Sequence, residues 1–133
     1  MSALLLDTSL LIDLERGAIS RSETIGDDDD PAIAAITLAE LRVGALLATG
    51  RAHQAQSDYV DDIAGSVPIL PYDQSVAEVH ARLLVEVRRQ GRPRGAHDLV
   101  IAATAAAHDR TIVSADSSAF EGLPGVITRS HRR

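Results

Sequence analysis

Short apolar runs alternate with helical patterns along this chain, and this alternation limits the possible folds more than any other feature of the sequence. The runs that we expect to form strands are ALLL (3–6), AIAAI (32–36), VPIL (67–70), TIVS (111–114) and GVIT (125–128). Strands that alternate with helices usually form a parallel sheet with helices on both faces. The sequence therefore predicts an α/β fold, organised as one domain over residues 1–133.

The segments between these strands divide into helices and loops. Apolar residues at helical spacing predict helices over 9–17, 37–50, 52–65, 73–91 and 96–109. Glycines end the first, second and fourth of them, and Asp73 is placed to cap the fourth. We expect the polar segments 18–31 and 91–95 to be loops.

Composition excludes several kinds of site. The chain has no cysteine, which rules out a disulfide framework, a zinc–thiolate site and a cysteine nucleophile. All 13 basic residues are arginine, so no mechanism can use a catalytic lysine. The net charge of −6 argues against a broadly basic nucleic-acid-binding surface. It is compatible with a nucleic-acid enzyme whose acidic centre is screened by metal.

The apolar runs are too short to span a bilayer. The longest conspicuous one, LVIAATAAA (99–107), has the length of a core helix, and no basic segment followed by a leader is present. We therefore expect a cytoplasmic protein without membrane association.

Four acidic residues lie close to the ends of separate predicted strands or at the start of helices. They are Asp7 directly after 3–6, Glu40 in the first turn after 32–36, Asp98 in the first turn of 96–109, and Asp116 just after 111–114. Sites in open parallel sheets form beyond the carboxyl ends of the strands. We therefore expect these four carboxylates to face one edge of the sheet.

Carboxylates that crowd together raise each other's pKa, and a divalent cation resolves that conflict. Oxygen ligands without cysteine or histidine suit Mg²⁺ or Mn²⁺. The chemistry that most often uses such a site is phosphoryl transfer, in which the metal activates a water and stabilises charge on the phosphate.

Each acid taken alone also has a structural interpretation. Asp7 could cap the following helix, and Thr37 with Glu40 matches a capping box. Asp98 could be a helix-start acid favoured by the helix dipole, and Asp116 could be an ordinary turn residue. Their common position at one edge of the sheet favours a shared site.

The most conspicuous acidic cluster is the run Asp27–Asp30, and we do not place the site there. It precedes Pro31 on the amino-terminal side of the 32–36 strand, at the far edge of the sheet. We interpret it as a solvated loop.

Three segments together resemble a known family. They are LLLDTSLLIDLERG (4–17), ITLAELRVG (36–44) and GRPRGAHDLVIAATAAAHDRTIVSADSSAFEGLPGV (91–126). In order and spacing the chain is similar to PIN-domain ribonucleases, and most of all to VapC-type toxins of toxin–antitoxin pairs. The resemblance implies a three-layer α/β/α PIN-like domain with a central parallel sheet.

It also implies a function: Mg²⁺- or Mn²⁺-dependent endoribonuclease activity that inhibits translation and growth. By position, the resemblance assigns Asp7, Glu40, Asp98 and Asp116 as catalytic and metal-binding residues, with Ser114, Thr8 and Ser9 in support. It implies three partners: an RNA substrate, a cognate VapB-type antitoxin and a second copy in a homodimer. The apolar stretch LRVGALLA (41–48) could pack against a partner helix.

One position departs from the family pattern. The family often has a further acid three residues after the fourth, just before a phenylalanine, and here that position is Ala119, followed by Phe120. The departure favours one bound ion in the free protein over a stable pair.

RNA binding requires positive charge around the acidic centre. We expect Arg92 and Arg94 to contact phosphates, because they precede Asp98 in sequence, and we interpret Arg88 and Arg89 as a solvated helix face. Further arginines, Arg129, Arg132 and Arg133, end the chain. Only three residues are aromatic, so backbone and shape contacts should outweigh base stacking. His97 adjoins Asp98, but neighbouring helix positions point in different directions.

Two other functions fit part of the pattern. An aspartyl-phosphate phosphotransferase also places Asp after a first parallel strand, but such folds usually need an acid two residues later and a lysine. Here that position is Ser9, and lysine is absent. A non-catalytic module that binds RNA or protein could keep the acids for structure, and metal-dependent activity would distinguish it from a nuclease.

Overall fold

The computed structural model describes residues 2–130 and contains a five-stranded parallel sheet. Its strands are β1 (Ala3–Leu6), β2 (Asp30–Ala34), β3 (Ile69–Leu70), β4 (Thr111–Ser114) and β5 (Thr128–Ser130), in the order β3-β2-β1-β4-β5. Every neighbouring pair is parallel. The expected α/β architecture with a central parallel sheet is therefore confirmed.

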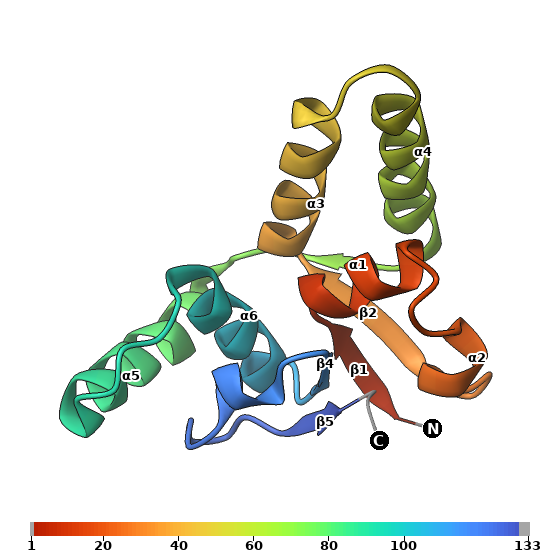
Figure 1. Cartoon of the computed structure of the whole chain (residues 1–133). Coiled ribbons are helices and arrows are strands. Elements are labelled where there is room, and N and C mark those ends of the chain that lie inside the picture. The colour runs from red at the N-terminus through yellow and green to blue at the C-terminus, as the bar shows by residue number, and fades with distance from the viewer. Residues whose placement is uncertain (1, 131–133) are drawn as a thin grey trace.

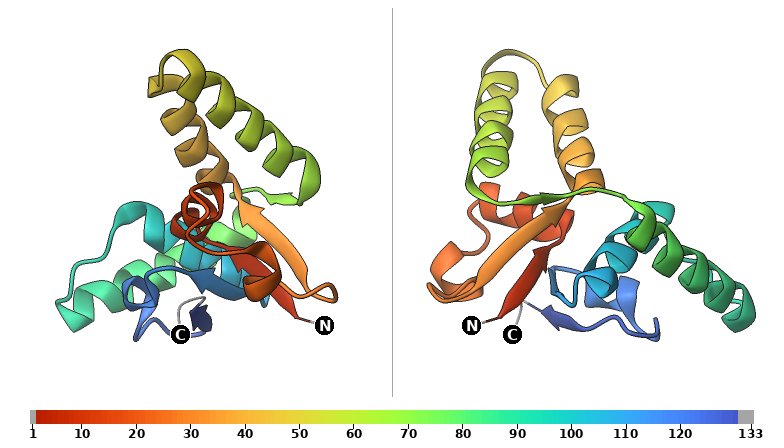
Figure 2. Two further views of the ribbon diagram at one scale, coloured as in Figure 1. Left: turned by 45° about the vertical axis from the view of Figure 1, so that its right-hand side comes forward. Right: turned by 180° about the vertical axis from the view of Figure 1, so that it is seen from behind.

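The helices lie on both sides of this sheet (Figure 1). They are α1 (Thr8–Glu15), α2 (Arg21–Thr24), α3 (Ala35–Leu47), α4 (Gly50–Ser66), α5 (Gln74–Gln90) and α6 (Ala96–Ala107), with a 3₁₀ helix η1 (Ser117–Phe120). Figure 2 shows that α3 and α4 form a pair that rises away from the sheet, while α5 and α6 pack together on the opposite side.

Strand β1 shows how the sequence builds the two layers of core. Its side chains alternate: Leu5 packs with α5, α6 and η1, whereas Leu4 and Leu6 pack with α1, α3 and α4. All three leucines are buried. Burying such a side chain stabilises the fold by about 1.5–3 kcal/mol. A continuous apolar run is therefore the pattern required of a central strand that is covered on both faces.

Several boundaries differ from the sequence-based expectation. Strand β2 begins at Asp30 and α3 at Ala35, so Ala35 and Ile36, expected in the strand, belong to the helix. Residues 21–24, expected in a loop, form the short helix α2, in which the Thr24 hydroxyl donates to the Ser20 carbonyl across 2.8 Å. Strand β5 begins only at Thr128, after Gly125 takes a left-handed φ of 76° that ends the preceding turn.

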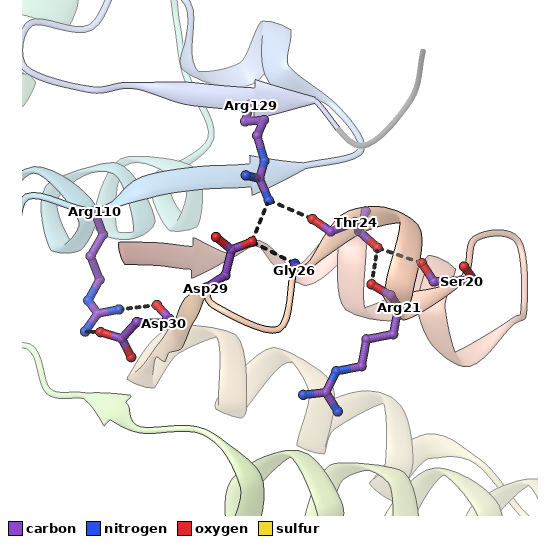
Figure 3. A network of polar contacts seen from close by, with 8 residues as sticks. All are labelled: Ser20, Arg21, Thr24, Gly26, Asp29, Asp30, Arg110 and Arg129. Carbon is purple, nitrogen blue, oxygen red and sulfur yellow. Dashed lines mark hydrogen bonds and ion pairs between the residues drawn. The ribbon is translucent and has the colours of Figure 1, made fainter. Parts of the chain in front are cut away.

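The acidic run at the amino-terminal edge of the sheet is only partly a solvated loop (Figure 3). Asp27 and Asp28 are exposed, but Asp29 and Asp30 are half-buried. Asp30 pairs with Arg110 across 3.2 Å, and Asp29 pairs with Arg129 across 3.5 Å. The expectation of a solvated loop was therefore wrong for these two acids, which bind arginines about 80 to 100 residues away in sequence.

Two of the arginines in Figure 3, Arg110 and Arg129, also donate hydrogen bonds to backbone carbonyls. Arg110 donates to Leu4 O at 3.1 Å and to Asp30 O at 2.8 Å, and Arg129 donates to Thr24 O at 2.6 Å. The Gly26 amide, and beyond it Arg129, hold the pKa of Asp29 below its usual range. These contacts hold distant segments together at the amino-terminal edge of the sheet, at the opposite end of the strands from the expected site.

Within residues 2–130, every helix is too short or too polar to cross a bilayer. Arg132 and Arg133 lie outside the described residues.

Candidate active site

Asp7 stands at the carboxyl end of β1 and is 5% exposed. Its Oδ1 accepts a hydrogen bond from the Thr8 amide at 2.7 Å, which makes it the N-cap of α1. Its Oδ2 accepts from the Ser9 hydroxyl at 2.9 Å and from the Ser114 hydroxyl at 2.7 Å. A buried carboxylate is stable only with such partners. Asp7 therefore caps a helix and also holds a fixed carboxylate at the edge of the sheet.

Two serine hydroxyls connect the ends of β1 and β4. Ser9 Oγ accepts from the Ala115 amide at 3.1 Å, and Ser114 Oγ accepts from the Asp116 amide at 2.9 Å. The two oxygens lie 3.3 Å apart. This network fixes the backbone that carries Asp116 relative to Asp7, and it places the hydroxyls of Ser9 and Ser114 against the Asp7 carboxylate.

Glu40 reaches the same edge from α3. Its Oε1 accepts a hydrogen bond from the Thr8 hydroxyl at 2.9 Å, so Thr8 joins α1 to α3. The expected capping box is wrong: α3 has Ala34 as its N-cap without a side-chain bond, and Thr37 is buried inside the helix. Because α3 starts two residues before the expected position, Glu40 lies in its second turn, and its side chain does not cap the helix.

His97 contacts Glu40, a relationship that its sequence position did not indicate. Its Nδ1 lies 3.3 Å from the other Glu40 oxygen, Oε2. Neighbouring positions of α6 do point in different directions, but α3 crosses close enough for both His97 and Asp98 to border one cleft with Glu40. This contact depends on how α3 packs against α6, so it could not be predicted from the sequence alone.

Asp98 is the third residue of α6 and is half-buried. Burial raises its pKa, and the charges of Asp7, Glu40 and Asp116 raise it further, while His97 opposes them. The other three acids are therefore near enough for their charges to act on Asp98. Gly95 allows the arrangement, because a Cβ there would lie 2.8 Å from Asp98 Oδ2.

Asp116 follows β4 at the start of η1 and is exposed. Its Oδ1 accepts a hydrogen bond of 2.5 Å from the Ser118 hydroxyl. Its backbone carbonyl also accepts from the Ala119 amide at 3.3 Å, as in an ordinary turn. Asp116 therefore combines a turn with a solvent-facing carboxylate beside the buried Asp7.

The donor set suits a hard divalent cation. Three carboxylates and one imidazole act on Asp98, and the repulsion that raises its pKa is the conflict that a cation relieves. With the side chains as they stand, no three acids or histidines within residues 2–130 are close enough to share one ion. Binding would thus require side-chain rotation, for which the exposed Asp116 and the half-buried Asp98 have room.

The arginines of the α5–α6 loop have unequal roles. Arg94 donates to the carbonyls of Ala119, at 3.0 Å, and Glu121, and so ties this loop to η1. Burial lowers the pKa of Arg94. Arg92 is exposed and makes one contact of 3.2 Å with the Ser118 carbonyl. Arg94 is thus engaged in structure, whereas Arg92 is open to solvent apart from this one contact.

Comparison with known proteins places the chain in a family. The PIN domain matches residues 4–125. The chain is 30% identical over 122 residues to Ribonuclease VapC of Rickettsia bellii, covering 91% of this chain and 90% of that protein. It is 35% identical over 120 residues to Ribonuclease VapC5 of Mycobacterium tuberculosis, covering 90% of this chain and 87% of that protein.

Solved structures agree. The VapBC-5 structure from Mycobacterium tuberculosis superposes with a TM-score of 0.80 at 30% identity, covering 98% of this chain and 99% of that chain. The DNA-bound VapBC from Salmonella typhimurium gives a TM-score of 0.86 at 25% identity, with the same coverage. With its parallel sheet and these relatives, the chain belongs to the PIN-domain family, among its VapC-type members.

Proposed function

We propose that this chain is a Mg²⁺- or Mn²⁺-dependent endoribonuclease that acts as the toxin of a toxin–antitoxin pair. The observation that carries the proposal is the hydrogen-bond network beyond the carboxyl ends of β1 and β4, in which Ser114 joins Asp7 to the backbone of Asp116. Thr8 extends this network to Glu40, which borders one cleft with Asp98. Relatives named VapC ribonucleases support the substrate class.

Asp7, Glu40, Asp98 and Asp116 would hold the ion. When bound, Mg²⁺ or Mn²⁺ lowers the pKa of a water and stabilises charge on the attacked phosphate. No side-chain nucleophile is then needed, which agrees with the lack of cysteine and lysine. Attack by water in line with the leaving oxygen would give products that end in a 3′-hydroxyl and a 5′-phosphate.

The neighbouring hydroxyls would keep the carboxylates aligned. Ser9 and Ser114 both donate to Asp7, and Thr8 donates to Glu40. Hydrogen bonds to ionised carboxylates favour the charged form that a metal needs. Arg92 would bind an RNA phosphate beside the cleft, as a charge that is free to move toward the strand.

The partners would be a VapB-type antitoxin and a second copy of the chain. The antitoxin assignment is supported by VapBC complexes among the similar structures. Val43, Leu46 and Leu47 of α3 are exposed to solvent by 54%, 69% and 79%, and they would provide apolar surface for a partner helix. In the cytoplasm, free toxin would inhibit translation and growth.

The test is cleavage of a mixed total-RNA pool with Mg²⁺ or Mn²⁺, compared with EDTA and with an Asp7→Asn, Asp98→Asn double variant. Discrete fragments that disappear with EDTA and in the double variant support the nuclease, and end-mapping then gives the substrate. If wild type and double variant behave alike in every metal, Asp7 and Asp98 are not catalytic ligands and the proposal is wrong.

A further inference from the structure

An apolar pocket lies beside the acidic cleft and is formed by the same two helices. Its lining includes Ile36 and Ala39 of α3, Val100 and Thr104 of α6, and Tyr72 and His80 from the segment after β3 and from α5. Thr104 donates its hydroxyl to the Val100 carbonyl across 2.7 Å, so its polar atom is already satisfied. The floor of the pocket therefore offers apolar contact and no free hydrogen-bonding group from this residue.

The pocket and the candidate active site are lined by neighbouring residues of the same two helices. Ala39 precedes Glu40 on α3, and His97 shares a face of α6 with Val100 and Thr104 because they are spaced by three and four residues. The 3.3 Å contact between His97 and Glu40 belongs to the cleft, and the pocket lining begins one residue away on α3 and three residues away on α6. A base in the pocket and a phosphate in the cleft would therefore belong to one short stretch of RNA.

Tyr72 gives the pocket an aromatic wall with a fixed orientation. Its side chain is half-exposed, its hydroxyl lies 2.8 Å from His80 Nδ1, and the two rings meet edge to face with centroids 5.7 Å apart. The other aromatic residues serve the interior: Phe120 is buried, and Tyr59 donates its hydroxyl to the Leu11 carbonyl. A held, accessible ring is a preorganised stacking surface.

We propose that this pocket receives one unstacked nucleobase of the RNA, next to the phosphate that is cleaved. The proposal rests on the proposed ribonuclease function and adds a subsite to it. A nucleobase is a flat ring with stacking faces and polar edges, carried at a short distance from a phosphate, and single-stranded RNA is recognised in part by stacking such bases on aromatic side chains. The apolar lining predicts selection by base size and stacking more than by hydrogen bonding.

The experiment measures RNA binding separately from cleavage. Each variant carries Asp98→Asn so that the RNA stays intact, and affinity for a fluorescent single-stranded oligoribonucleotide is read by anisotropy. Tyr72→Ala should weaken binding about tenfold, whereas Tyr72→Phe keeps the ring and should bind as the parent does. Val85→Ala, which removes an exposed apolar side chain elsewhere on α5, is the matched control. Thermal unfolding verifies that each variant is folded.

A series of oligonucleotides with one abasic site identifies the base concerned. One abasic position should weaken binding to the parent about as much as Tyr72→Ala does, and should have no further effect in Tyr72→Ala. The proposal is overturned if Tyr72→Ala binds RNA like the parent, if abasic sites affect both proteins equally, or if Tyr72→Ala weakens binding of the antitoxin alone.

The two hypotheses fail in different ways. A chain that binds RNA through Tyr72 but never cuts it would refute the nuclease and leave the subsite. A chain that cuts RNA with unchanged affinity and base preference in Tyr72→Ala would keep the nuclease and refute the subsite. Absence of RNA binding together with absence of metal-dependent cleavage by wild type would refute both.

Discussion

Ser114 donates a hydrogen bond of 2.7 Å to the buried carboxylate of Asp7, and this contact joins the ends of two adjacent parallel strands. It lies one residue beyond the last pair of the β1–β4 register, Leu6 with Val113. The register of the sheet and this bond together fix the position of the Asp7 carboxylate. A charge at the end of an apolar strand is tolerable because three hydrogen-bond donors meet it there.

Removing the Ser114 hydroxyl should lower both stability and activity. Ser114→Ala deletes the bond to Asp7 and leaves the Asp116 amide without its partner. We expect a loss of about 1–3 kcal/mol in the free energy of unfolding, measured by urea denaturation, and slower RNA cleavage. Ser66→Ala, an exposed serine that bonds only within its own helix, should change stability by less than about 0.5 kcal/mol. Equal stability of the two variants would contradict this view of Asp7.

Asp98 should make stability depend on pH. Burial and the charges of Asp7, Glu40 and Asp116 raise its pKa above 3.8. The folded state therefore binds a proton at Asp98 more tightly than the unfolded state does. The ionised form therefore destabilises the fold at neutral pH, and the penalty fades as the pH falls through the raised pKa toward 3.8. Asp98→Asn should raise the Tm at pH 7 in EDTA, and the difference should shrink in acid.

The matched control for this titration is Asp28→Asn in the exposed loop. It should show no such pH-dependent gain. Added Mg²⁺ should raise the Tm of wild type and leave that of Asp98→Asn nearly unchanged, because a ligand that binds only the folded state stabilises it. A lower Tm for Asp98→Asn in EDTA at pH 7 would contradict the account.

Arg110 should be required for stability and not for catalysis. It makes three hydrogen bonds at the far edge of the sheet, to Leu4 O, Asp30 O and Asp30 Oδ2, and its side chain is 14% exposed. Arg110→Met should cost about 2–3 kcal/mol in urea denaturation, with an unchanged cleavage rate per folded molecule. Arg51→Met, at an exposed position of α4, should be nearly neutral. A loss of rate without a loss of stability would place Arg110 in the active site instead.

Arg92 and Arg94 should respond differently to truncation. Arg92→Ala should weaken RNA binding and reduce its salt dependence by about one phosphate contact, with little effect on Tm. Arg94→Ala should lower the Tm, because the carbonyls of Ala119 and Glu121 lose their donor. Anisotropy at several salt concentrations and thermal unfolding distinguish the two. If Arg92→Ala binds RNA like wild type at every salt concentration, its expected role is wrong.

Local patterns predicted the parts of the site that depend on local structure. Asp7 after its strand and Asp98 in the first turn of its helix could be placed because each depends on a boundary a few residues away. The start of α3 was misplaced because Ala34 carries no capping side chain, whereas Thr37 and Glu40 imitate a capping box.

Contacts between distant segments were beyond such reasoning. His97 meets Glu40 only because α6 and α3 pack together, and Arg94 meets η1 across about 25 residues of sequence. Asp29 and Asp30 were expected in a solvated loop because no arginine adjoins them in sequence. Their arginine partners come from β5 and from the residue before β4. In each case the partner is set by the topology of the sheet.

The proposed active site is tested most directly by locating a bound divalent ion. Substoichiometric Mn²⁺ broadens the amide resonances of nearby residues in a ¹H–¹⁵N NMR spectrum, so it can compare the two acidic regions in one sample. The account predicts broadening at Thr8, Asp98 and Ala115, lost in Asp98→Asn and kept in Asp28→Asn. Broadening centred on Gly26–Asp29, or an equal effect in wild type and Asp98→Asn, would contradict it.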